Sequence, residues 1–252
     1  MISSQDRERY LRQISIEGFG EGGQELVSRA RVLVAGAGGL GCSVCTYLAA
    51  AGVGTLRVID RGEVELSNLN RQVLFGEGDI GKPKAFSLQA RLRDLNPSIQ
   101  IEPVHAVLSK ESVADMLAGI DLAVDALDNL ATRYVLNKAC VERGLPLVHG
   151  AVNGFTGQAM TVLPWQGACL MCLFGGTEQV ETIPVLGGAP GMVGCIESME
   201  VIKLVTGLGV PLVGRLLMID GLTMGATELE IARNPRCPHC GSGVARSPTG
   251  SE

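Results

Sequence analysis

A glycine-rich turn near the start of the chain restricts the fold more than any other feature. A β-branched run at 31–35 leads directly into Gly36-Ala37-Gly38-Gly39-Leu40-Gly41, and a helical pattern follows over 42–51. A second apolar run ends in Asp60, nineteen residues after Gly41. In this order of strand, turn, helix and strand, the glycines let the backbone approach a phosphate at a helix N-terminus, and the carboxylate accepts ribose hydroxyls. The pattern predicts a nucleotide site that comprises Gly36, Gly38, Gly39, Gly41 and Asp60. The alternative is a tight turn without a ligand.

The rest of the chain alternates strand and helix patterns. Further β-branched runs lie at 99–104, 122–126 and 145–149, and helical patterns lie at 82–95, 110–118 and 131–143. This alternation indicates a parallel, doubly wound sheet over residues 30–150. Strands then follow at 157–164, 215–220 and 227–232, the last two as a hairpin, with a helix over 192–205. We therefore expect an α/β fold in which antiparallel strands continue a Rossmann-like doubly wound parallel sheet into one mixed sheet.

No repeat or linker divides the chain. We expect a single domain over residues 1–240, with a nucleotide-binding half at 30–150 and a second half at 151–240. A stretch rich in Gly, Pro and Thr predicts a mobile crossover loop at 175–191. The small polar residues of 241–252 predict a disordered tail.

Charge and hydropathy argue against two classes of partner. The formal net charge is -5, whereas non-specific nucleic-acid binding depends on an excess of Lys and Arg. No apolar run is long enough to cross a membrane, and the polar start Met-Ile-Ser-Ser-Gln-Asp-Arg is unlike a signal peptide. We expect a cytoplasmic protein that binds neither nucleic acid nor membrane.

Two Cys-x-x-Cys pairs predict a metal site in the second half. They are Cys169/Cys172 and Cys237/Cys240, separated by 64 residues. Two thiolates three residues apart can bind one Zn²⁺ from a tight turn, and two such turns complete a tetrahedron. Four thiolates leave no open coordination position, so the zinc would be structural rather than catalytic. The alternative is four unligated, buried thiols.

A polar segment after Asp60 indicates a triphosphate site. It contains Ser67, Asn68 and Arg71, and Lys84 follows in Gly81-Lys82-Pro83-Lys84. Splitting a triphosphate moves negative charge onto the leaving pyrophosphate, and several cations are needed to stabilise that charge. Arg71 and Lys84 suit this role, and Asn68 suits a phosphate or ribose contact. Each basic residue alone would also fit a solvated surface position.

Asp128 and Asn129 follow the predicted strand at 122–126, at the sheet edge where such folds bind ligands. An aspartate there can hold Mg²⁺ between phosphates. The alternative is that one of the two caps the helix that begins near Ala131. Both interpretations hold together if Asp128 binds the ion and Asn129 forms the cap.

In combination these motifs resemble the ThiF/MoeB/HesA family, relatives of the ubiquitin-activating enzymes. The resemblance runs from about Arg7 to Cys240. Its markers are Arg9-Tyr10-x-Arg12-Gln13, the glycine turn, Asp60, Ser67-Asn68-Leu69-Asn70-Arg71-Gln72, Gly81-x-Pro83-Lys84, Asp128-Asn129 and the two cysteine pairs.

The resemblance implies a homodimeric adenylyltransferase that uses ATP and Mg²⁺. Its substrate would be the C-terminal glycine of a small ubiquitin-like sulfur-carrier protein (MoaD/ThiS-like), with release of pyrophosphate, in molybdopterin or thiamin biosynthesis. The resemblance further implies that Arg12 reaches into the partner subunit's ATP site, that Arg71 and Lys84 hold phosphates, that Asp128 serves the magnesium and that the cysteines hold structural zinc. A C-terminal carboxylate, with a pKa near ~3.5, is already a nucleophile and needs no general base.

The chain departs from some relatives in the crossover loop. Those relatives carry a reactive cysteine there, whereas residues 175–191 contain none, and Val180, Glu181 and Thr182 occupy the corresponding region. Cys195, in the next helix, is expected to be buried. We therefore predict adenylation without an obligatory covalent bond to the carrier. Three alternatives remain: a small-molecule carboxylate as acceptor, a non-catalytic nucleotide-binding partner subunit, and an NAD-dependent oxidoreductase.

Overall fold

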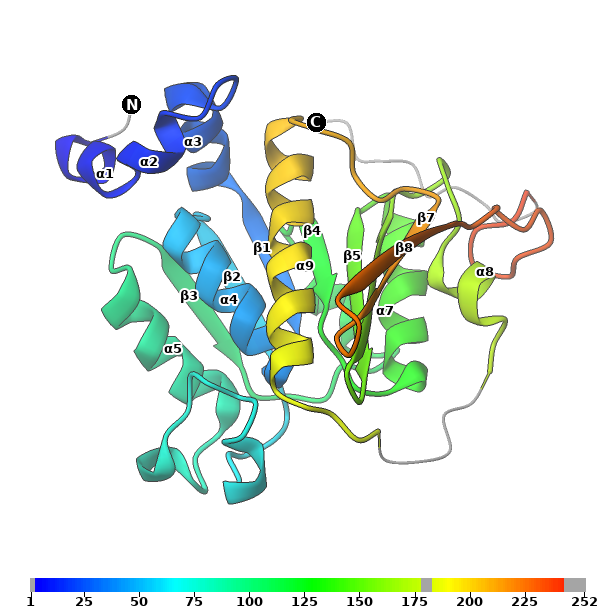
Figure 1. Cartoon of the computed structure of the whole chain (residues 1–252), viewed down its shortest axis with the longest axis horizontal. Coiled ribbons are helices and arrows are strands. Elements are labelled where there is room, and N and C mark those ends of the chain that lie inside the picture. The colour runs from blue at the N-terminus through cyan, green and yellow to red at the C-terminus, as the bar shows by residue number, and fades with distance from the viewer. Residues whose placement is uncertain (1–2, 178–182, 243–252) are drawn as a thin grey trace.

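A mixed sheet of eight strands forms the centre of the computed structural model, which describes residues 3–177 and 183–242 (Figure 1). The spatial order is β3-β2-β1-β4-β5-β6-β7-β8. Neighbouring strands are parallel from β3 to β5 and antiparallel from β5 to β8. The strands are β1 (Arg31–Ala35), β2 (Thr55–Ile59), β3 (Gln100–Val104), β4 (Leu122–Asp125), β5 (Leu147–Asn153), β6 (Thr156–Val162), β7 (Arg215–Asp220) and β8 (Gly225–Glu230). The predicted fold class is confirmed.

Helices cover both faces of the sheet. One face packs against α3 (Gly20–Arg29), α4 (Gly39–Ala51), α5 (Lys84–Leu95) and α9 (Gly188–Thr206). The other packs against α6 (Val113–Met116), α7 (Leu130–Arg143) and α8 (Leu170–Phe174). The remaining elements are α1 (Ser4–Arg9), α2 (Leu11–Ile14) and the 3₁₀ turns η1 (Leu66–Asn68) and η2 (Glu77–Asp79).

Strand β1 shows why the sequence forms two core layers. Val32 and Val34 pack in the core on the α4 side, whereas Leu33 and Ala35 pack in the core on the α7 side. All four are fully buried. Successive side chains of a strand point to opposite faces, so a strand covered on both sides needs an unbroken apolar run.

The structure differs from the sequence prediction at the crossover loop. The predicted loop covers 175–191, but α9 already begins at Gly188 and includes Pro190 in its first turn. Proline is tolerated there because first-turn N–H groups have no partner within the helix. Before the helix, the backbone of Pro184 and Leu186 pairs with Gly154 in the turn between β5 and β6. Val180, Glu181 and Thr182 lie outside the described residues.

Two further predictions concern the tail and the membrane. The first tail residues hydrogen-bond to the preceding loop, Gly241 N–H to the Cys237 carbonyl and Ser242 N–H to the Pro235 carbonyl, and 243–252 lie outside the described residues. Within 3–177 and 183–242, no helix is long and apolar enough to cross a membrane. The cytoplasmic location and the single-domain organisation stay predictions from the sequence.

Candidate active site and metal centre

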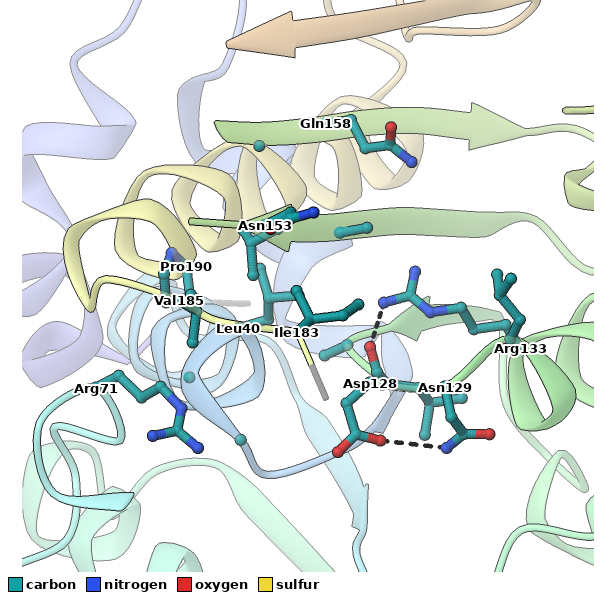
Figure 2. Close-up of a pocket in the computed structure, with 18 of the residues that line it drawn as sticks. Leu40, Arg71, Asp128, Asn129, Arg133, Asn153, Gln158, Ile183, Val185 and Pro190 are labelled. Atoms are coloured by element: carbon teal, nitrogen blue, oxygen red, sulfur yellow. Dashed lines mark hydrogen bonds between the residues drawn. The ribbon is translucent and has the colours of Figure 1, made fainter. Parts of the chain in front are cut away.

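Two adjoining cavities lie at the carboxyl ends of the parallel strands, where the sequence places the nucleotide site. The smaller one, about 310 Å³, is lined by Asp60, Asn68 and Lys84, and we call it the Asp60 pocket. The larger one, about 840 Å³, is lined by Asn153 and Gln158, and we call it the Gln158 pocket (Figure 2). Both pockets share a wall that consists of Gly38, Arg61, Arg71, Gln72, Ala126, Leu127, Asp128 and Asn129. The two cavities therefore meet at the glycine turn and the Asp128 turn.

The glycine turn packs closely against neighbouring backbone. Gly36 has φ +103°, and a Cβ there would lie 2.5 Å from the Ala126 carbonyl oxygen. A Cβ on Gly41 would overlap the Gly36 carbonyl oxygen. Gly38 lines both pockets and Gly39 begins α4. Larger residues would therefore push the turn away from β4 and from the helix N-terminus.

Asp60 is fixed beside the glycine turn by two backbone N–H groups. Its Oδ2 accepts a hydrogen bond from the Ala37 N–H at 2.8 Å, and its Oδ1 accepts one from the Gly62 N–H at 2.6 Å. Each carboxylate oxygen can accept a further bond. The side chain is thus oriented in the Asp60 pocket with acceptor capacity left for hydroxyl groups.

Three cations line the Asp60 pocket: Arg61, Arg71 and Lys84. Arg71 donates to the Ser67 carbonyl and to Asn70 Oδ1, each at 2.9 Å. Among the described residues, none of the three forms an ion pair with a carboxylate. Within the described part of the chain, these three cations therefore line the pocket without a direct carboxylate partner. Arg71 and Lys84 were predicted from the sequence, whereas Arg61, which directly follows Asp60, was not.

The other predicted residues of this segment have different places. The Asn68 side chain is buried and accepts from the Glu65 N–H at 3.1 Å, which closes the turn η1, while it also lines the Asp60 pocket. Ser67 lines neither pocket. Arg12 lies on α2. The next residue, Gln13, donates a hydrogen bond to the Ala51 carbonyl at the C-terminal end of α4. The glycine turn is at the opposite end of α4, so α2, which carries Arg12, lies away from the glycine turn of its own chain (Figure 1).

Asp128 and Asn129 lie side by side before α7, and the structure tests the capping role. Asn129 Oδ1 accepts from the Thr132 N–H at 2.9 Å, which confirms it as the N-cap of α7. Its Nδ2 donates to Asp128 Oδ1 at 3.2 Å. Asp128 is exposed at the common wall of both pockets (Figure 2). A carboxylate in this position suits a divalent cation next to phosphates.

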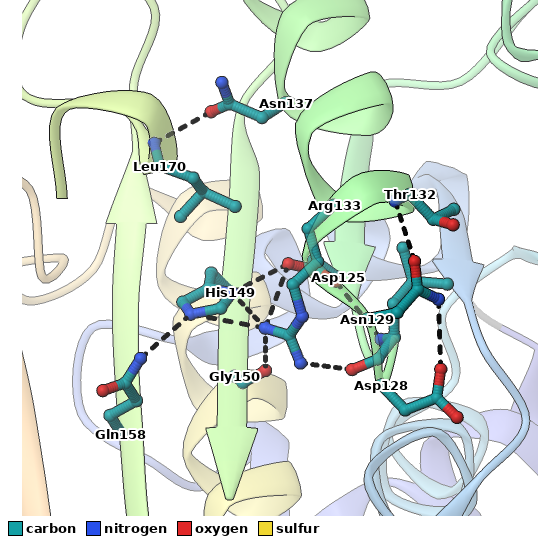
Figure 3. A network of polar contacts seen from close by, with 11 residues as sticks. Asp125, Asp128, Asn129, Thr132, Arg133, Asn137, His149, Gly150, Gln158 and Leu170 are labelled. Atoms are coloured by element: carbon teal, nitrogen blue, oxygen red, sulfur yellow. Dashed lines mark hydrogen bonds and ion pairs between the residues drawn. The ribbon is translucent and has the colours of Figure 1, made fainter. Parts of the chain in front are cut away.

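A buried network lies behind this turn; from the sequence, His149 was predicted as a hydrogen-bonded core residue, but its partner Arg133 was not predicted. It joins Asp125 at the end of β4, Arg133 on α7 and His149 on β5 (Figure 3). His149 Nδ1 lies 2.7 Å from Asp125 Oδ2 and 2.9 Å from Arg133 Nη1; because an ionised carboxylate can only accept, we assign the Nδ1 proton to the shorter contact with Asp125. The Arg133 Nη1 atom, 3.4 Å from the same oxygen, donates to it and to the Gly150 carbonyl at 2.9 Å. Nη2 donates to the Leu127 carbonyl.

The charges of this network follow from its burial. Burial alone would raise the pKa of Asp125, but the Arg133 guanidinium and the His149 hydrogen bond hold it below its ordinary value. Burial lowers the pKa of His149, and the Arg133 charge lowers it further against the opposing effect of Asp125. The network is therefore an Asp–Arg ion pair with a neutral histidine. In the sequence, the one signal for Arg133 is its place one helical turn after the Asn129 cap.

The four motif cysteines converge on the α7 side of the sheet. Their Sγ atoms all lie within 4.8 Å of one another, with Cys169 to Cys237 at 3.7 Å and Cys172 to Cys240 at 3.5 Å. A tetrahedron with Zn–S bonds of about 2.3 Å has S···S edges of about 3.8 Å. The donor set and its spacing thus fit one zinc ion. Burial raises the pKa of the Cys169 thiol, and a bound cation would favour its thiolate form.

The remaining cysteines and His239 take no part in this tetrad. Cys42 and Cys45 are buried on α4 as expected, and burial raises the pKa of Cys42 to about 12. Cys195 is half-buried rather than buried, because it lies on the side of α9 that turns away from the sheet. The His239 Nδ1 atom accepts a hydrogen bond from Asn137 at 2.8 Å, which keeps this ring away from the metal position.

Comparison with known proteins agrees with the motifs. The model of the ThiF family matches residues 10–239. The chain belongs to the ThiF family. The SAMP-activating enzyme E1 of Haloferax volcanii is 46% identical over 242 residues, which cover 94% of this chain and 89% of that protein. The molybdopterin-synthase adenylyltransferase of Escherichia coli is 42% identical over 248 residues, which cover 95% of this chain and 98% of that protein.

Other ThiF-family relatives carry similar names. The sulfur carrier protein adenylyltransferase of Thermus thermophilus is 42% identical over 250 residues, which cover 95% of this chain and 92% of that protein. Among solved structures, E. coli MccB superposes with a TM-score of 0.84 at 22% identity and covers 95% of this chain and 75% of that one. At this identity the likeness shows the fold alone. The family that the sequence motifs indicated is confirmed.

Proposed function

We propose that this ThiF-family chain is an ATP-dependent adenylyltransferase that acts on the C-terminal glycine carboxylate of a small ubiquitin-like sulfur-carrier protein. The reaction would attach AMP to that carboxylate and release pyrophosphate. The observation that carries the proposal is the pair of adjoining cavities with Arg61, Arg71 and Asp128 at their common wall. The names of the relatives, which include sulfur carrier protein adenylyltransferases, support it.

The Asp60 pocket provides the groups that ATP needs. Asp60 has free acceptor capacity for the ribose hydroxyls, and the glycine turn, at the N-terminus of α4, would place phosphates near backbone N–H groups. Arg71, Lys84 and Arg61 would stabilise the charge that moves onto the leaving pyrophosphate. Asp128 would hold Mg²⁺, which supplies charge neutralisation between the phosphates when it is bound.

The Gln158 pocket suits an extended chain end. It runs from the glycine turn along β5 and β6 to Ile183 and Val185, and its volume of about 840 Å³ is larger than one carboxylate needs. No histidine lines it among the described residues. None is required, because a peptide carboxylate with a pKa of about 3.5 is a nucleophile at neutral pH. The pocket has only to place this group against the α-phosphate.

Two further parts of the proposal concern assembly and zinc. In a homodimer, Arg12 would reach the partner subunit's nucleotide, since in its own chain it lies at the far end of α4. Zinc bound to the four cysteines would join the segment after β6 to the end of the described chain. Whether the pathway is that of molybdopterin or of thiamin depends on the carrier.

ATP–pyrophosphate exchange tests the proposal. Exchange should require a carrier protein that ends in Gly-Gly and should fail with a carrier whose C-terminus is amidated. Lys84→Ala should abolish exchange, because it removes a cation from the Asp60 pocket. Lys82→Ala is the matched control, because Lys82 lies two residues earlier and pairs with Asp79 instead. If small carboxylic acids supported the exchange without any carrier protein, the acceptor would be a small molecule rather than a protein. Equal exchange by both lysine variants would contradict the assigned site.

A further inference from the structure

We propose that Arg133 is the positioning residue of this active site, which holds the Asp128 turn against strand β5. The inference rests on the proposed function, because it assigns Arg133 a role toward the metal-binding carboxylate. Arg133 itself reaches Asp128 only through the backbone: it binds the carbonyl of Leu127, the residue before Asp128 (Figure 3). The same guanidinium binds the Gly150 carbonyl at 2.9 Å.

These two carbonyls belong to opposite sides of the active site. Leu127 and Asp128 form part of the wall that the two pockets share. Gly150 lies on β5, directly before Ala151, Val152 and Asn153, which line the Gln158 pocket. One planar side chain therefore sets the distance between the turn that would hold magnesium and the strand along which the acceptor would lie.

The guanidinium is itself held in one orientation. Its Nη1 protons are directed to the Gly150 carbonyl and to Asp125 Oδ2, and Nη2 is directed to the Leu127 carbonyl. His149 donates to the same Asp125 oxygen at 2.7 Å and so helps to fix the carboxylate. Arg133 is 5% exposed and Asp125 is fully buried. Packing and charge thus leave the arginine little freedom to rotate.

Lysine cannot reproduce this arrangement. An arginine presents donors in a rigid, planar fork, whereas a lysine ammonium is a compact charge on a flexible stem. An ammonium at the position of Nη1 could keep the Asp125 and Gly150 contacts but would lose the contact to Leu127. Arg133→Lys therefore keeps the buried charge and specifically frees the Asp128 turn. Groups that orient a metal ligand from behind typically change metal affinity or activity by about 10- to 100-fold.

The chain provides a matched control at the other end of the sheet. Arg57 on β2 also binds two backbone carbonyls, those of Met116 and Ala118 at 2.8 and 2.9 Å, and pairs with the carboxylate of Glu102. It lines neither pocket. Arg57→Lys thus removes a similar set of contacts away from the active site. Asp125→Asn is a second variant. Its amide has only one oxygen, so it can accept either from Arg133 and His149 or from the Leu127 N–H, but not from both sides as the carboxylate does.

The test combines a kinetic and a substrate-free measurement on the zinc-loaded, full-length protein. In ATP–pyrophosphate exchange, we expect Arg133→Lys to raise the Mg²⁺ concentration for half-maximal rate about 10- to 100-fold, with a smaller change in KM for ATP. In hydrogen exchange without substrates, the peptide over 125–131 should exchange about 10-fold faster or more. Arg57→Lys should change neither, and Asp125→Asn should change both in the same direction as Arg133→Lys.

The outcomes separate the role of Arg133 from the proposed function of the chain. An Arg133→Lys protein whose Mg²⁺ requirement and exchange at 125–131 match those of Arg57→Lys overturns the role of Arg133. If Arg133→Lys does not fold, Asp125→Asn gives the same decision. A wild-type protein without any ATP–pyrophosphate exchange would overturn the proposed function. The substrate-free hydrogen exchange would then still show whether Arg133 holds the turn.

Discussion

Glu197 on α9 allows a pH-dependent prediction of stability. Its side chain is fully buried, and neither carboxylate oxygen has a hydrogen-bond partner among the described residues. It packs so closely on β5 that a Cβ on Gly150 would overlap the carboxyl group. Burial and the negative charge of Asp125 raise the pKa of Glu197 well above its ordinary value, and the charge of Arg133 opposes this only in part. The Cys45 thiol nearby is neutral, because burial raises its pKa as well.

The folded protein therefore keeps a proton on Glu197 that the unfolded chain loses near a pH of about 4.3. The contribution of this proton to the free energy of unfolding is fully present below that pH. It is lost as the pH rises toward the folded-state pKa of Glu197, by up to about 1.4 kcal/mol per pH unit. Glu197→Gln has nearly the same shape and cannot ionise. Relative to wild type, it should gain up to about 2.7 kcal/mol between pH 4.5 and 6.5, or about 5–10 °C in melting temperature.

Thermal unfolding of both proteins at matched pH values from 4.5 to 7.5 measures this difference, and the comparison at equal pH cancels the other titrating groups. Glu200→Gln is the control, because Glu200 is one turn further along α9 and equally buried. Unlike Glu197, it accepts from the Leu212 N–H at 2.7 Å and pairs with Lys203. Its replacement should destabilise the protein by about 1–3 kcal/mol. A Glu197→Gln protein whose advantage stays constant or shrinks with rising pH would refute the reasoning.

Two further substitutions test the zinc centre and the cysteine prediction. Asn137→Ala removes the side chain that accepts from the Leu170 N–H at 3.0 Å and donates to His239, so it should weaken zinc binding about 10-fold or more in competition with a chelator. Unchanged zinc retention would show that these contacts do not support the metal site. Cys195→Ala should form adenylate at the wild-type rate, because no covalent step is expected. Loss of adenylate with intact ATP binding would show that this thiol takes part in the reaction.

Local sequence patterns predicted most of the fold. The glycine turn, the run at β1 and the alternation of elements depend on contacts between near neighbours, and such contacts determine which face of a strand or helix is buried. The four cysteines were also predictable, since a Cys-x-x-Cys pair fits a single turn whatever surrounds it. Capping of α7 by Asn129 follows from the same kind of local chemistry.

Long-range contacts explain what the sequence did not predict. Arg133 and His149 are sixteen residues apart, and their contact depends on the parallel pairing of β4 with β5, which brings Asp125 beside His149. Nothing next to Arg133 in the chain distinguishes it from an exposed helical arginine. Arg61 was missed although its contact is local, because it directly follows Asp60, and the spacing from the glycine turn points to Asp60 instead. The start of α9 at Gly188 was missed because glycine and proline usually indicate a loop.

Helix α7 connects the two features that appeared unrelated in the sequence. Asn129, Arg133 and Asn137 recur every four residues, so they lie along one side of the helix. Asn129 caps the helix beside Asp128, and Arg133 binds the carbonyl before Asp128. One turn further, Asn137 contacts both cysteine loops, through the Leu170 N–H and through His239. The cysteine tetrad is thus attached to the same helix face as the Asp128 turn. A structural zinc in this place would help to fix α7 and, through Arg133, the Asp128 turn.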